Sequence, residues 1–292
     1  MKFSKLTAAL ATSAAVIFGG SAGAATISNA DGNLSPFGGF DWAAGGAAWT
    51  NGLTAAETAF ENGACGVSAC NFQITYVAWA TALTRPGGSG LTTPRLDGNP
   101  NGSPGGAGFY EYTIKATLTG TITNYVEGDE ANYVISGGLF DIFYDTSANA
   151  NLNASPAPGN QWDGFDDGVK IISGTLFTLT PQELSLVNGN GIVALVGTVT
   201  EQDNTYVNPQ LLGTNVTSTL QLFPSPSITN FTRPISVDGV PLPPVGVGDD
   251  EALFQADANQ AFTAVPEPAS LLLAGLALAG AGVASRRRRK AA

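Results

Sequence analysis

The chemistry open to this 292-residue chain is limited first by an absence, because the chain contains no histidine. A Ser-His-Asp or Cys-His site therefore cannot form, and the commonest side-chain ligand of zinc and copper is missing. Carboxylates remain, and two carboxyl groups at the right separation are enough for glycoside hydrolysis. Because 23 acidic residues supply many chance pairs, the sequence leaves a carboxylate-dependent glycosidase open without selecting its residues.

The two cysteines, Cys65 and Cys70, have four residues between them. Redox centres of the thioredoxin type have two intervening residues, so this spacing favours a structural disulfide over a redox pair. A stable disulfide also fits an oxidising compartment outside the cytoplasm. We therefore predict a bond that pins a short loop ahead of the strand that follows.

Oxygen ligands gather at residues 163–167, where Asp163, Asp166 and Asp167 offer carboxylates suited to calcium. The spacing is not that of an EF-hand loop, and Asp with Gly is also the ordinary composition of turns. A solvated turn is the first interpretation, and a calcium site is the weaker alternative. No other cofactor is expected.

One of the four tryptophans has the setting of a binding residue. Trp162 lies among Gly, Asn, Gln and Asp residues, so its ring is the candidate for stacking on a sugar. Trp42, Trp49 and Trp79 have apolar or strand-like surroundings and are expected in the core.

The elements that must position these residues are strands. Within residues 109–125 the apolar side chains share one parity, at Tyr110, Tyr112, Ile114, Ala116, Leu118 and Ile122. Glu111, Lys115 and five threonines occupy the other parity. This alternation predicts a half-buried strand with its polar face toward solvent, which Gly120 bends or divides.

Strong β-propensity also marks residues 71–83, 132–145, 169–180, 191–201 and 215–223. Helical spacing is limited to residues 53–61 and 250–261, with one further turn at 181–187, and the stretches 85–108 and 146–168 are typical of loops. We therefore predict an all-β fold, an antiparallel β-sandwich-like single domain over residues 25–264. Its Pro-rich part, 224–264, is typical of an extended stalk.

The N-terminus predicts a secretory signal peptide over residues 1–24. Lys2 and Lys5 precede the uncharged run 6–18, and Ala22 and Ala24 give the small-x-small pattern that signal peptidase recognises. The signal-peptide helix that this run would form is too short for a permanent membrane span. Cleavage is expected after Ala24.

The C-terminus, residues 265–292, combines three features in order. Pro266, Glu267 and Pro268 precede the uncharged segment 269–284, and a basic cluster follows, made of Arg286, Arg287, Arg288, Arg289 and Lys290. Sixteen helical residues reach about 24 Å, slightly short of the ~30 Å hydrocarbon layer, and arginine side chains can bridge the difference. The pattern predicts a short transmembrane helix with its basic end in the cytoplasm.

This tail resembles the PEP-CTERM sorting signal of Gram-negative bacteria. In that family exosortase, a membrane-embedded cysteine protease, recognises the signal and removes the tail. The resemblance makes Pro266, Glu267 and Pro268 the recognition motif and the arginines the stop signal. It implies a transient inner-membrane intermediate, then a place at the cell surface or in the extracellular matrix, with a link to exopolysaccharide, biofilm or flocculation. A plain tail anchor is the alternative, and it leaves the Pro-Glu-Pro sequence unexplained.

Charge excludes one class of partner. Between the two ends only five basic residues face all 23 acidic ones, and nucleic-acid affinity comes largely from Lys and Arg on phosphates. The expected function is that of an exported, non-catalytic surface or matrix protein with extracellular polysaccharide as partner. A carbohydrate-binding module is the alternative, and the glycosidase is the further alternative.

Overall fold

The computed structural model describes residues 25–66, 69–98, 108–126, 130–150, 164–178, 183–185, 191–223, 236–237, 240–241 and 253–263. These residues belong to one compact unit, Ala25–Thr263. The predicted signal peptide, the sorting motif, the transmembrane segment 269–284 and most of the Pro-rich stretch lie outside the described residues.

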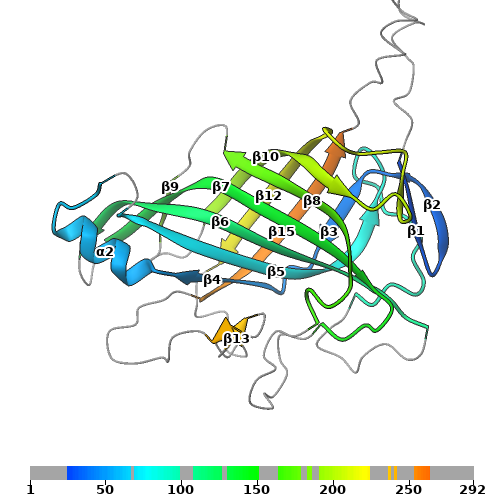
Figure 1. Ribbon diagram of the computed structural model, residues 1–292, viewed down its shortest axis with the longest axis horizontal. Helices are drawn as coiled ribbons and strands as arrows, with labels where there is room; N and C mark the ends of the chain where they lie inside the picture. Colours follow the sequence, from blue (N-terminus) through cyan, green and yellow to red (C-terminus); the bar gives the residue numbers. More distant parts are fainter. Residues whose placement is uncertain are drawn as a thin grey trace, which may run out of the picture. The chain divides into compact units, whose positions relative to one another are not determined.

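The fold is mostly β and is built on a closed antiparallel barrel of eight strand positions (Figure 1). Seven positions are single strands: β5 (Asn71–Thr84), β6 (Glu111–Val126), β7 (Glu130–Asp145), β8 (Val169–Thr178), β10 (Gly191–Gln202), β12 (Asn215–Phe223) and β15 (Leu253–Thr263). β3 (Gly39–Trp42) and β4 (Gly46–Asn51) share the eighth, because each pairs with β5 on one side and β15 on the other. The sheet closes where β15 also pairs with β12.

Smaller elements surround the barrel. β1 (Ala25–Asn29) pairs with β2 (Gly32–Phe37) and with β11 (Val207–Asn208), and β9 (Glu183–Ser185) pairs with β7. β13 (Ser236–Val237) and β14 (Val240–Pro241) form a separate two-stranded sheet. The helix α2 (Leu53–Glu61) connects β4 to β5 and contributes Leu53 and Ala56 to the main core.

Side chains inside the barrel alternate in size from strand to strand. One row of paired residues runs through Phe254, Ala48, Tyr76, Ala116, Phe140, Gly174 and Val199. A neighbouring row runs through Leu118, Gly138, Leu176, Gly197 and Val216. A small residue beside each large one lets side chains fill a narrow barrel without clashing.

The strand predictions are confirmed, but the predicted sandwich is corrected to a barrel. All six predicted strands appear within three residues of their expected ends, as does the helix at 53–61. Period-2 burial is common to strands of sandwiches and of barrels, so the pattern alone does not tell one from the other. Gly120 does not divide its strand; β6 is continuous, with a register shift against β7 at this position.

Two helical predictions are wrong. The helix predicted at 250–261, within the predicted stalk, is contradicted by β15 (Leu253–Thr263), which lies in the barrel wall. The helical turn predicted at 181–187 is contradicted by β9 (Glu183–Ser185). In β15 the side chains of Phe254, Ala256, Ala258, Gln260 and Phe262 are all buried, which is the alternation of a strand. Their burial between β12 and the shared strand position overrides the helix propensity of the Ala and Gln residues.

Cys65 and Cys70 form a disulfide, as their spacing predicts. The bond links the end of α2 to the start of β5, with Cys65 exposed and Cys70 buried in the main core. It therefore fixes the connection through which the chain enters β5.

Removing this bond with Cys65→Ala and Cys70→Ala together is expected to lower the free energy of unfolding by about 2 kcal/mol, because so short a loop restricts the unfolded chain only modestly. Urea denaturation of the purified protein measures the loss. In the untreated exported protein, mass spectrometry should find neither cysteine alkylated; two alkylated thiols would contradict the bond.

Candidate functional site

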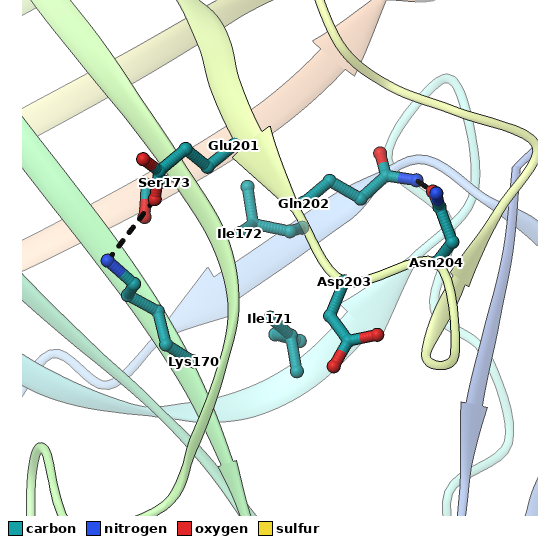
Figure 2. A pocket seen from close by; sticks show the side chains of 8 residues that line it. All are labelled: Lys170, Ile171, Ile172, Ser173, Glu201, Gln202, Asp203 and Asn204. Carbon is teal, nitrogen blue, oxygen red and sulfur yellow. Dashed lines mark hydrogen bonds and ion pairs between the residues drawn. The ribbon is translucent and has the colours of Figure 1, made fainter.

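A solvent-facing hollow of about 450 Å³ opens where β8 and β10 lie side by side (Figure 2). The register shifts here twice, between β7 and β8 at Ile142 and Phe143 and between β8 and β10 at Val199 and Glu201. Such bulges re-aim side chains and interrupt the regular ladder. The hollow is lined by Lys170, Ile171, Ile172, Ser173, Glu201, Gln202, Asp203 and Asn204.

Lys170 is the one cation among the lining residues. Its Nζ lies 3.4 Å from Glu201 Oε2, the pair joined by the dashed line in Figure 2, and 3.6 Å from Asp141 Oδ1. Ser173 Oγ donates a hydrogen bond to the same Asp141 oxygen at 2.5 Å. Because the lysine side chain is 46% exposed, each ion pair contributes about 1 kcal/mol at most.

The opposite rim of the hollow is fixed by hydrogen bonds. Gln202 Nε2 donates to Asn204 Oδ1 and to the Val207 carbonyl, both at 2.8 Å, and Gln202 Oε1 accepts from the Leu211 amide. The Asp203 amide donates to the Ile171 carbonyl at 2.9 Å. The hollow thus presents ammonium, carboxylate, amide and hydroxyl groups on a held frame, which suits hydrogen bonding to a polar ligand.

A second group of interest is Glu111, a carboxyl buried on the outward face of β6. The side chain is 2% exposed, and its Oε1 accepts hydrogen bonds from the backbone amides of Asn149 at 2.9 Å and Ala150 at 3.0 Å. Burial raises the pKa of Glu111 to about 7, with a further contribution from the negative charges of Asp145 and Asp97; the two amide bonds oppose the rise.

The sequence predicts that Glu111 faces solvent together with a row of threonines. This prediction is wrong, because a distant segment packs on that face and buries Glu111. Thr113, next on that face, is also buried, and its Oγ1 donates to the Phe165 carbonyl at 2.7 Å. Residues 148–150 and 164–168 cover this part of β6. The period-2 pattern shows which face leaves the core, but not what packs on that face from a distant segment.

The tryptophans divide as predicted where they are described. Trp42, Trp49 and Trp79 are 1%, 2% and 4% exposed, so all three are core residues. Trp42 lies in the main core, whereas Trp49 and Trp79 lie in a separate apolar cluster. The proposed sugar-stacking residue Trp162 lies outside the described residues.

Two of the three calcium candidates have protein partners. Asp166 Oδ2 lies 3.3 Å from Lys115 Nζ, and Asp167 Oδ2 accepts a hydrogen bond from Asn149 Nδ2 at 2.9 Å. Asp163 lies outside the described residues. Within the described part of the chain, no group of three His, Cys, Asp or Glu side chains is placed to hold a metal ion.

The described residues define a mostly β protein with a closed barrel and a polar hollow in its wall. None of the described helices is long and apolar enough to cross a membrane. Residues 264–289 match the family model of the PEP-CTERM protein-sorting motif, which confirms the resemblance drawn from the sequence. This motif indicates an exported protein that exosortase sorts to the cell surface. No curated protein and no solved structure matches the chain.

Proposed function

We propose that this chain is a non-catalytic protein of the cell surface or extracellular matrix, associated with exopolysaccharide in biofilms or flocs. The observation that carries the proposal is the sorting motif at residues 264–289. Signal peptidase removes residues 1–24, the body crosses the inner membrane, and exosortase then removes the tail. The barrel is the part that stays outside the cell.

The charge and surface of the barrel support a role in a hydrated matrix. The chain carries 23 acidic residues and 12 basic ones, most of the latter near the two ends. Divalent cations can bridge such a surface to acidic polymer, and the net charge keeps the protein soluble.

Fractionation of wild-type cultures tests this proposal. The protein is expected in the polysaccharide-rich extracellular fraction, and intact mass is expected to correspond to a chain without residues 1–24 and without the arginine cluster. Deletion of the coding region should reduce aggregation. A mature protein that keeps its arginines, or one absent from the polysaccharide fraction, would contradict the proposal.

A carbohydrate-binding module is the second candidate, favoured by the polar hollow of Figure 2. Its ammonium, amide and carboxylate groups match the hydroxyl-rich surface of a sugar. A glycan array with the wild-type protein and with Lys170→Ala separates the candidates, because Lys170 lines the hollow and its side chain is 46% exposed. Retention that is specific for one glycan and lost in Lys170→Ala supports a binding module, whereas uniform weak retention supports a matrix component without one.

A further inference from the structure

Two segments form a cover on the outward side of the barrel wall, residues 146–150 and 164–168, here called the outer strap. Phe165 and Ala150 of the strap complete an apolar cluster whose other members come from the wall region: Ala43, Ala47, Trp49, Val77 and Trp79. The ring centroids of Trp79 and Phe165 are 6.5 Å apart. The strap therefore covers part of Trp79, which is 4% exposed and whose Nε1 also donates to the Gly98 carbonyl at 3.3 Å from outside the strap.

The strap is attached to three successive outward positions of β6. The Glu111 carboxyl accepts from the amides of Asn149 and Ala150, Thr113 Oγ1 donates to the Phe165 carbonyl, and Lys115 Nζ contacts Asp166 Oδ2. The Thr113 bond has no charged partner, and the Lys115 pair is partly exposed and of small energy. Only Glu111 combines a titratable group with nearly complete burial.

The charged groups around Glu111 disfavour its ionised form. Asp145 lies opposite Glu111 in the β6–β7 ladder, and Asp97 adds negative charge from the segment before β6. The other charged groups of the packed elements are Lys115 on β6, Asp166 and Asp167 on the strap and Arg95 before β6, whose Nε is 2.8 Å from Asp31 Oδ1. Closure of the strap therefore leaves an ionised Glu111 with two amide donors but little water.

We propose that the outer strap is a pH-responsive cover, which holds Trp79 enclosed while Glu111 is protonated and loosens when Glu111 ionises. The physical reason is that an open strap lets water reach the carboxylate, whereas a closed strap excludes it. This inference does not depend on the proposed matrix function. It concerns a built-in conformational response of the barrel wall.

The direction and size of the response follow from linkage. In the closed state the pKa of the Glu111 carboxyl is about 7, against an ordinary value of 4.5. Closed-state stability is therefore fully present below pH 4.5 and falls as the pH rises toward 7, after which it levels off. If the open state has the ordinary pKa, the opening equilibrium constant increases about 30-fold between pH 5.5 and pH 8.5.

Amide hydrogen exchange of the purified full-length protein tests the proposal. Protection factors of the Asn149 and Ala150 amides, corrected for intrinsic exchange, are expected to fall about 30-fold between pH 5.5 and pH 8.5. In Glu111→Gln, which keeps an acceptor and cannot ionise, they should change less than about 3-fold. Amides in the central β6–β7 ladder should show no comparable fall in either protein.

A second variant and a second signal keep the test decisive if Glu111→Gln folds poorly. Thr113→Val removes the bond to Phe165, so it should lower protection at every pH while keeping the wild-type pH dependence. Acrylamide quenching that rises with pH in wild-type protein, and not in Trp79→Phe, would place the exposure at Trp79. Protection of Asn149 and Ala150 that is independent of pH, or lost together with the β6–β7 amides, would overturn the proposal.

Discussion

Phe40→Ala is expected to lower the free energy of unfolding by about 4 kcal/mol, the range typical of a fully buried aromatic ring. Phe40 on β3 is 1% exposed, and its ring is stacked on Trp42 at a centroid distance of 4.9 Å. Phe37 and Tyr112 contact the same ring at 5.1 and 5.3 Å. The substitution therefore removes the shared member of an aromatic cluster that links β2, β3 and β6.

Phe177→Ala is the matched control, because it deletes the same atoms from the outward face of β8. The Phe177 ring is 46% exposed, so its loss is expected to cost about 1 kcal/mol or less. Urea denaturation of both variants, with equal m-values, makes the two losses comparable. Equal losses would contradict the assignment of Phe40 to the interior and Phe177 to the outside.

Local patterning was enough to locate most of the strands. In β6 the residues Tyr112, Ile114, Ala116 and Leu118 are all 3% exposed or less, as their shared parity predicts. Closure of the sheet is different, because it depends on β15 pairing with both β12 and the β3–β4 position. Those partners lie some 40 and 200 residues away along the chain, and no local period specifies them.

The alternation of large and small residues across strands is a feature of the barrel that the sequence alone does not reveal. Ala116, Gly138, Gly174 and Gly197 each lie between larger inward neighbours once the strands are in register. Along the chain these residues are widely separated, and each appears only as a single small residue within an apolar strand sequence. Only the register brings them into two neighbouring rows, Ala116 with Gly174 and Gly138 with Gly197, so recognising the alternation requires the topology that it would help to predict.

The candidate sites also differ in whether local sequence can reveal them. The sorting motif is predictable because its three parts are contiguous and act through their order along the chain. The buried carboxyl of Glu111 is not, because its partners Asn149 and Ala150 lie nearly 40 residues away and bond through backbone amides that carry no sequence signature. The Lys170 hollow likewise depends on two bulges, which the strand pattern does not reveal.

Gly120→Ala is expected to destabilise the protein by about 2–3 kcal/mol through overpacking rather than through a lost contact. Gly120 on β6 lies opposite Phe72 on β5, and an added Cβ would come within 2.8 Å of Cε1 and Cε2 of the Phe72 ring. The ring is itself held by an edge-to-face contact with Tyr133, with centroids 5.4 Å apart. It therefore cannot move aside without disturbing the neighbouring strand β7.

A double-mutant cycle isolates this cause. Phe72→Leu alone should cost about 1–2 kcal/mol, but in the Gly120→Ala background it makes room for the new methyl group, so the double variant should be at least about 1 kcal/mol more stable than the sum of the single losses predicts. Gly90→Ala is the control: no neighbouring atom lies within 4 Å of its added Cβ, and the expected change is within about 0.5 kcal/mol. Strictly additive losses would mean that Gly120 is required for the backbone register shift at Thr119 and Gly120, and not for the space that the Phe72 ring occupies.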